Sequence, residues 1–112
     1  MSPVRRDWLE RLLTQVAAAL ARALGYRARG EEEQALEEIR RATLELFGIP
    51  RSMLLALEPR AALEVLATPR LREAAFQLLD TEESILRAVG KVADADALAA
   101  WLRRTREAAE AP

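Results

Sequence analysis

Apolar residues recur every three or four positions along most of the chain, which is the spacing of one face of an α-helix. At the start of the chain this pattern predicts a helix from Pro3 to about Ala28, with Ser2 as its cap. Gly25 is expected inside this helix, because Tyr26 returns to the apolar flank. The predicted core-facing residues are Leu9, Leu12, Leu13, Val16, Leu20, Ala23 and Leu24.

A second helix is predicted between Gly30 and Gly48. Glutamates at positions 31–33 stand in its first turn, where the positive end of the helix dipole favours acidic side chains. Leu44 falls on the charged face of this helix. The core face is expected to hold Ala35, Ile39, Ala42 and Leu46, with Leu36 and Phe47 at its edge.

Prolines interrupt the pattern between residues 49 and 68, which predicts two short helices near 51–57 and 59–67. Thr68 and Pro69 then repeat the cap-and-proline start of a longer helix. The apolar residues of the short helices are expected to cover one end of the core: Met53, Leu54, Leu57, Leu63 and Leu66.

Glu82 conflicts with the pattern, because it falls in the middle of the apolar face of the helix predicted from Pro69 towards Val89. One resolution is a break at Asp80, with Asp80 and Glu83 forming a variant of the capping box. The other is a continuous helix with Glu82 half-buried against an arginine. The absence of Gly or Pro in this segment favours the continuous helix.

The last helix is expected to begin with Asp94 as its cap, after a turn at Gly90. Its predicted core face holds Ala95, Leu98, Leu102, Thr105 and Ala109, with Trp101 at the edge. Ala, Leu, Glu and Arg favour helix throughout, and no alternating run of β-branched residues indicates a strand. The sequence therefore predicts an all-α fold of about six helices, in a single domain over residues 1–112.

An internal repeat appears when the chain is offset by sixty residues. Gly30 then falls on Gly90, and Ala35 falls on Ala95. Glycine allows a tight reversal, and alanine lets the second helix of each pair approach the first closely. The pattern predicts two antiparallel helical hairpins, at about 3–48 and 69–110, around a short insert at about 49–68.

The first hairpin resembles a tetratricopeptide (TPR) unit, with Tyr26, Gly30, Ala35 and Ala42 at the spacings of the family's aromatic, Gly, Ala and Ala positions. Ala19, Arg22 and Ala23 depart from the family's early Trp/Leu-Gly signature, and the second hairpin keeps little beyond Gly90 and Ala95. The whole chain is also similar to small bacterial all-helical proteins of unknown function. The resemblance implies a TPR-like protein-interaction scaffold and brings no catalytic residues with it.

Composition narrows the chemistry, because the chain has no Cys, no His and no Asn. Disulfides, thiolate zinc sites and Cys or His catalysis are excluded, and the Glu-x-x-His pairs of four-helix metal sites are absent. No glycine-rich phosphate loop appears. We therefore expect no enzyme activity, no metal and no cofactor.

The charges are mixed: 16 Arg and one Lys are interspersed with 18 acidic residues, for a net charge of −1. Binding of nucleic acid depends on a basic surplus, so none is expected. The longest uncharged run has ten residues, too short to span a membrane, and the default location is cytoplasmic. The lack of Asn and Cys with Arg and Glu enrichment fits a thermostable protein, although codon bias in a GC-rich genome has a similar effect.

Four residues are candidates for a partner surface: Trp8, Tyr26 and Trp101 at the edges of apolar stripes, and Leu44 on a charged face. Two repeats are fewer than stacked arrays normally need, which predicts that the insert or a partner covers the exposed ends and motivates the hypothesis of a homodimer. The predicted function is a non-catalytic interaction or scaffold module that forms a homodimer.

The alternative function is binding of a small or regulatory ligand in a polar pocket between the hairpins. The inner-helix positions of the TPR resemblance supply its candidate residues, which are Arg27, Gln77, Asp80, Ser84 and Arg87. Residues 77, 80, 84 and 87 share one helix face by their spacing. An ordinary solvent-exposed helix face has the same pattern, so the spacing fits both a ligand-binding face and a solvent-exposed one.

Overall fold

The computed structural model describes residues 3–111, and the periodic stripes fold there as six α-helices. They are α1 (Pro3–Ala28), α2 (Glu32–Phe47), α3 (Arg51–Leu54), α4 (Pro59–Val65), α5 (Pro69–Ala88) and α6 (Val92–Glu110). Residues 3–111 contain no β-strand, which confirms the all-α class. The predicted Ser2 cap lies outside the described residues.

The chain reverses direction in the same way at Gly30 and Gly90, which have φ values of 76° and 85°. Glu31 N donates to Tyr26 O at 2.8 Å, and Lys91 N donates to Leu86 O at 2.9 Å. Each turn therefore closes with the long-range bond of a Schellman motif, which requires a left-handed residue that only glycine adopts without strain. The sixty-residue offset found in the sequence corresponds to equivalent turn geometry.

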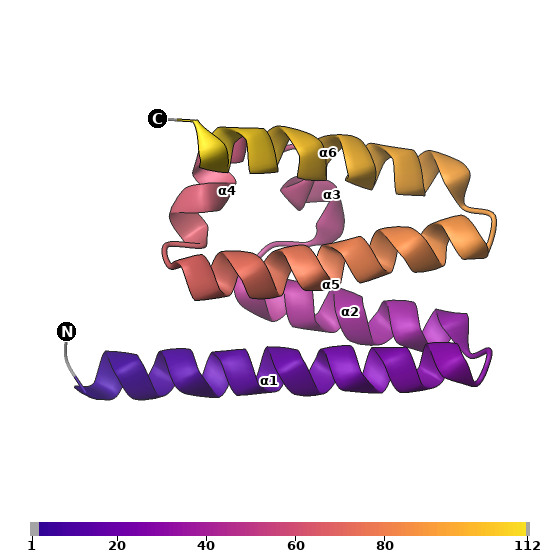
Figure 1. Cartoon of the computed structure of the whole chain (residues 1–112), viewed down its shortest axis with the longest axis horizontal. Coiled ribbons are helices and arrows are strands. Elements are labelled where there is room, and N and C mark those ends of the chain that lie inside the picture. The colour runs from indigo at the N-terminus through magenta and orange to yellow at the C-terminus, as the bar shows by residue number, and fades with distance from the viewer. Residues whose placement is uncertain (1–2, 112) are drawn as a thin grey trace.

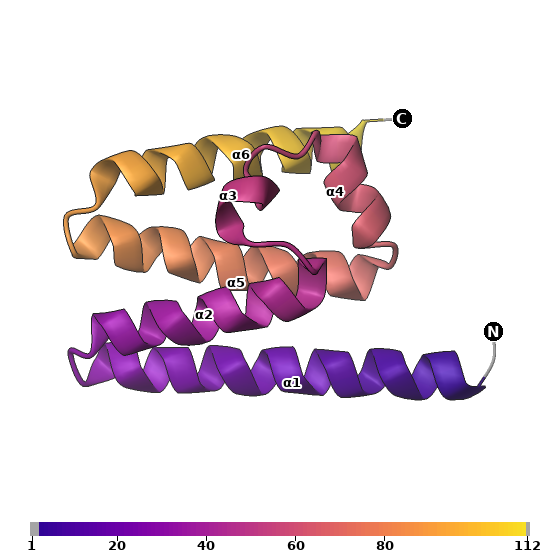
Figure 2. The ribbon, with the colours of Figure 1, turned by 180° about the vertical axis from the view of Figure 1, so that it is seen from behind.

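Each turn joins two antiparallel helices, so α1 lies beside α2 and α5 lies beside α6 (Figure 1). α5 packs against both α1 and α2, which joins the two pairs. In the view from behind, α3 appears between α5 and α6, and α4 lies against the C-terminal end of α6 (Figure 2). α3 also contacts α2, so the insert touches both hairpins.

One apolar cluster at the centre receives side chains from all six helices. Ala35 and Ala95, the small residues five positions after the turn glycines, have no exposed surface. Phe47 and Trp101 meet edge to face, with ring centroids 6.4 Å apart, which joins α2 to α6. The prediction that Trp101 lies at the edge of the apolar face is therefore wrong, because its side chain is 1% exposed and fills the core.

Hydrogen bonds at the C-terminal end of the insert hold it against α5. Thr68 accepts a hydrogen bond from Leu71 N at 3.2 Å and so caps α5, as its sequence predicts. Arg72 Nε donates to Leu66 O at 2.9 Å and ties the end of α4 to α5. Both short helices end earlier than predicted, and Met53 is exposed rather than part of the core.

Helix ends account for most of the other errors in the predicted core. Leu24 is exposed, and so is Ala109 in the final turns of α6. Leu24 adjoins the buried Ala23 in sequence, so it points about 100° away from the core direction. α6 begins at Val92 with Lys91 as its cap, so Asp94 lies in the first turn instead of capping it.

No helix in residues 3–111 has both the length and the apolar character needed to cross a membrane.

Candidate functional site

Glu82 is fully buried in an unbroken α5, with 2% of its side chain exposed. The continuous helix is therefore confirmed over a break at Asp80, and burial is more complete than predicted. Arg51 of α3 donates to both carboxylate oxygens of Glu82, through Nε at 3.0 Å and through Nη2. Arg51 Nη2 also donates to Thr43 Oγ1 of α2 at 2.8 Å. We call these three residues, which join three helices, the Arg51 cluster.

The Arg51 cluster satisfies Glu82 but leaves part of Arg51 free. A guanidinium has five N–H donors, and the Nη1 amino group of Arg51 makes no hydrogen bond to a described residue. This group is not among the fully buried unpartnered atoms, and the Arg51 side chain is 19% exposed. Arg51 therefore keeps donors that solvent or a ligand can reach.

A cavity of about 410 Å³ adjoins the Arg51 cluster. Its lining residues come from α2, from α3 and the residue that follows it, from α5 and from α6. Its lining residues are Arg40, Arg51, Ser52, Leu55, Glu82, Leu86, Asp94, Ala97 and Leu98. We call it the inter-hairpin cavity.

The walls of the inter-hairpin cavity carry opposite charges. Arg40 comes from α2 and Asp94 from the first turn of α6, and neither forms an ion pair with another described residue. Near the hairpin turns, Lys91 Nζ lies 3.5 Å from Glu33 Oε1 and links the same two helices.

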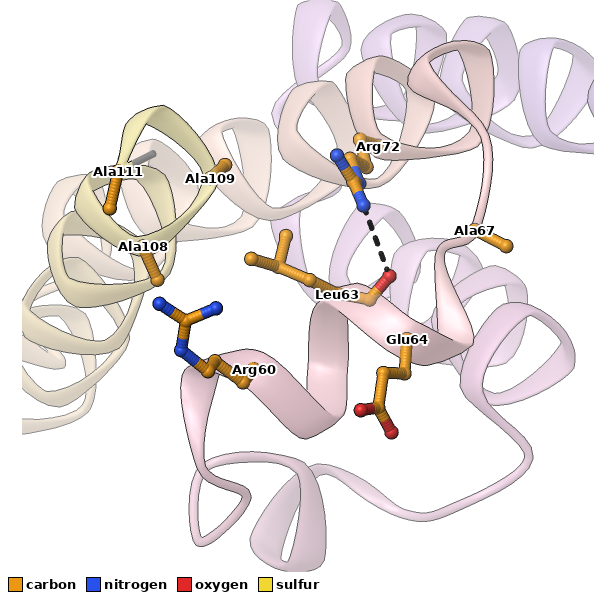
Figure 3. A pocket seen from close by; sticks show the side chains of 8 residues that line it. All are labelled: Arg60, Leu63, Glu64, Ala67, Arg72, Ala108, Ala109 and Ala111. Atoms are coloured by element: carbon orange, nitrogen blue, oxygen red, sulfur yellow. Dashed lines mark hydrogen bonds between the residues drawn. The ribbon is translucent and has the colours of Figure 1, made fainter.

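A second cavity, of about 480 Å³, lies between α4 and the end of α6 (Figure 3). Three alanines of the α6 end form one side of it, namely Ala108, Ala109 and Ala111. Arg72 donates there to Leu63 O at 3.4 Å, in addition to its bond to Leu66 O, so it serves to hold α4. Arg60 extends towards Ala108, and Glu64 points away from the alanines (Figure 3). This cavity is larger, but its only polar or charged lining residues are Arg60, Glu64 and Arg72, against five in the inter-hairpin cavity.

The residues predicted for a polar ligand pocket form local bonds with different neighbours. Arg27 Nη2 donates to Ser84 Oγ at 2.9 Å, which joins α1 to α5. Asp80 pairs with Arg106 of α6, and Arg87 pairs with Glu83 and with Asp96 of α6. Gln77 is exposed. The structure therefore brings Arg27 and Ser84 together, while Asp80 and Arg87 face α6.

The residues predicted for a partner surface separate by exposure. Trp8 is 56% exposed and Leu44 is 47% exposed. Tyr26 is half-buried under Arg29, whose guanidinium carbon lies 5.1 Å from the ring centroid. Trp101 is buried, so the prediction that it belongs to a partner surface is wrong. Trp8 is the large apolar side chain that the fold leaves most accessible at the start of α1.

An ion pair fixes the beginning of α1 to the beginning of α5. Glu10 Oε1 lies 2.6 Å from Arg70 Nη1, and both side chains are solvent-exposed. Hydrogen bonding and charge attraction from Arg70 hold the pKa of the Glu10 carboxyl below its ordinary value. The same contact raises the pKa of Arg70.

The sequence does not predict that four of the residues lining the inter-hairpin cavity lie near one another. They are Arg40, Arg51, Ser52 and Asp94. The one available signal was Glu82 on an apolar face, which demands a cationic partner. The spacing along the chain does not identify that partner as Arg51, because α3 is a short insert whose position depends on tertiary packing.

The described side chains contain no group of three or more acidic, His or Cys residues placed to hold a metal ion. Comparisons of the chain with protein-family models, with curated proteins and with solved structures find no match.

Proposed function

We propose that this chain is a non-catalytic interaction module that self-associates through the first half of α1. The observation that carries the proposal is the exposure of Trp8, at 56%, on a helix whose antiparallel partner ends before reaching it. Tryptophan is enriched at the energetic centres of protein interfaces, where its large apolar surface is buried. We also propose that the two hairpins are TPR-like units, and their matching turns support this relationship.

The register of α1 against α2 places Trp8 in an unpartnered position. Arg22 Nε donates to Glu38 Oε2 at 3.1 Å, so these two residues lie opposite each other. α2 ends at Phe47, nine residues after Glu38, and thus opposite residue 13 of α1. α1 continues well beyond that point, as both views show (Figures 1 and 2).

Trp8 also points to the side of α1 that α2 covers further along. It precedes Gln15 by seven residues and Arg22 by fourteen, and residues seven apart lie on nearly the same side of a helix. Gln15 and Arg22 both line the groove between α1 and α2. A helix that continued the path of α2 would therefore cover Trp8.

A second copy of the chain is the occupant we propose for this position. Each copy has an α1 that extends beyond α2, so each offers both a helix and the unpartnered side of that helix. Two such segments can pair in an antiparallel arrangement about a two-fold axis, which is the commonest symmetry of soluble oligomers.

Sedimentation velocity and light scattering test this proposal. The unmodified chain is expected to be a dimer at micromolar concentration, and Trp8→Ala is expected to be a monomer with the same helical circular dichroism. Leu24→Ala is the matched control, because Leu24 is exposed on the same helix but on another side. A monomeric unmodified chain, or a Trp8→Ala variant that stays dimeric, would contradict self-association through this surface.

A further inference from the structure

The inter-hairpin cavity carries hydrogen-bonding groups that the fold itself leaves unpaired. Within residues 3–111, the Arg40 guanidinium, the Ser52 hydroxyl and the Asp94 carboxylate line the cavity and have no hydrogen-bond or ion-pair partner. The Nη1 amino group of Arg51 is likewise unbonded and belongs to a cavity-lining residue. Donors therefore gather on the α2 and α3 sides, and an acceptor stands on α6.

The inter-hairpin cavity has one positive and one negative side chain that the fold leaves unpaired within the described residues. Arg51 and Glu82 neutralise each other through two hydrogen bonds, which leaves Arg40 and Asp94 as the charges without a partner. These two residues come from opposite walls and lie too far apart to form an ion pair. A ligand with one charge would be attracted to one wall and repelled by the other, whereas a zwitterion would satisfy both.

Between the charged walls the lining is apolar, formed by Leu55, Leu86, Ala97 and Leu98. The volume of about 410 Å³ is in the lower part of the range of small-ligand sites. Leu86 and Leu98 are buried core residues and Leu55 is half-buried, so this apolar surface is held in place by packing.

We propose that the inter-hairpin cavity binds a small zwitterion with an apolar side chain, of the chemistry of a free aliphatic α-amino acid. Its carboxylate would accept hydrogen bonds from Arg40, Arg51 Nη1 and Ser52. Its ammonium group would donate to Asp94, and its side chain would contact the leucines. The buried Glu82 has a positioning role, because its two bonds to Arg51 fix the guanidinium with Nη1 free.

Three probes that share one apolar body test the proposal by isothermal titration calorimetry and by NMR chemical-shift mapping. Leucine carries both charges, isocaproate carries only the carboxylate, and isoamylamine carries only the ammonium group. Leucine is expected to bind and to shift the amide signals of residues 51–55 and 94–98. Each one-charge probe is expected to bind at least about tenfold more weakly, since charge-assisted hydrogen bonds are lost.

Substitutions at the rim separate the two charges. Arg40→Gln and Asp94→Asn are each expected to weaken leucine binding by about tenfold or more. Arg41→Gln and Asp96→Asn are the matched controls, because these residues lie on the same helices but pair elsewhere, and they should leave binding unchanged. All four residues are solvent-exposed, so the fold should tolerate each change.

Ala97→Leu tests the cavity without changing any charge. Ala97 lines the cavity from an exposed position on α6. The larger side chain of the Ala97→Leu variant should fill the cavity without disturbing the helix, and the variant should no longer bind free leucine. The proposal is overturned if leucine does not bind the unmodified chain, if isocaproate or isoamylamine binds as tightly as leucine, or if Ala97→Leu binds as before.

Discussion

Glu82 shows how one residue can oppose its local pattern and still be required by the fold. The side chain lies on the apolar face of α5 and is buried there, where an unpaired carboxylate is strongly unfavourable. Arg51 is brought to it from the insert, and Thr43 holds the guanidinium from α2. α3 is therefore held both by this polar contact and by the burial of Leu54, which is 1% exposed.

The first prediction concerns the stability of this pair. Arg51→Met should lower the free energy of unfolding by about 3–5 kcal/mol, because it leaves the buried Glu82 carboxylate without its partner. Glu82→Leu should cost less, because the Arg51 side chain is 19% exposed and keeps its bond to Thr43. The double variant should recover most of that loss, since well-packed apolar residues replace buried ion pairs at little cost. Urea denaturation monitored by circular dichroism measures the free energy of unfolding of the unmodified chain, the two single variants and the double variant. Additive losses in the double variant would show that the pair is not coupled.

The second prediction concerns Glu10 and the pH. Because Arg70 lowers the pKa of Glu10 in the folded chain, the ion pair contributes its stability above the carboxyl's unfolded pKa. That contribution is lost as the pH falls through the lowered folded pKa. The stability difference between the unmodified chain and Glu10→Gln should therefore be present at neutral pH and shrink in acid.

An NMR titration of the Glu10 carboxyl carbon measures the same effect directly. Its midpoint should lie below the ordinary value of a glutamate, and Arg70→Gln should raise it towards that value. A midpoint that Arg70→Gln leaves unchanged would show that the contact does not persist in solution.

At the scale of helices and turns, the glycines have different physical roles. Gly30 and Gly90 have positive φ, and a Cβ added at either would meet nothing within 4 Å. The requirement for glycine at these turns is therefore conformational and not steric. Gly25 lies inside α1, where an added Cβ would make only an ordinary contact with the Arg29 side chain, at 3.6 Å.

The third prediction follows from this contrast. Gly30→Ala and Gly90→Ala should each destabilise the fold by about 1–2 kcal/mol, the penalty of a left-handed backbone for a residue with a Cβ. Gly25→Ala should instead stabilise it by about 0.5–1 kcal/mol, because alanine favours the helix interior. Thermal and urea unfolding compare the three variants. Equal effects at positions 25 and 30 would contradict the assignment of the turns.

Helices and turns are also what the sequence predicts best. Gly30, Gly90 and Thr68 have local roles, so their neighbours in sequence suffice to identify the turns and the cap. Leu24 and Met53 were assigned to the core wrongly, because exposure there depends on which helix lies opposite. The partner of Glu82 and the walls of the inter-hairpin cavity depend on α3 and α6 meeting α2, and no spacing along the chain encodes that contact.

At the scale of the whole molecule, the hairpins and the insert make two surfaces of different kinds. Residues of α2, the insert, α5 and α6 line the inter-hairpin cavity. The extension of α1 beyond α2 leaves Trp8 accessible on the outside. The two surfaces share no residue, so ligand binding and self-association can be tested independently.

The most direct test of the central proposal reads the surroundings of Trp8 itself. Trp101→Phe leaves Trp8 as the single tryptophan of the chain, so its fluorescence reports one site. As the protein concentration rises through the micromolar range, the emission is predicted to shift to the blue as a second copy covers the indole. An emission maximum that stays at the position of fully hydrated tryptophan at every concentration would contradict self-association through α1.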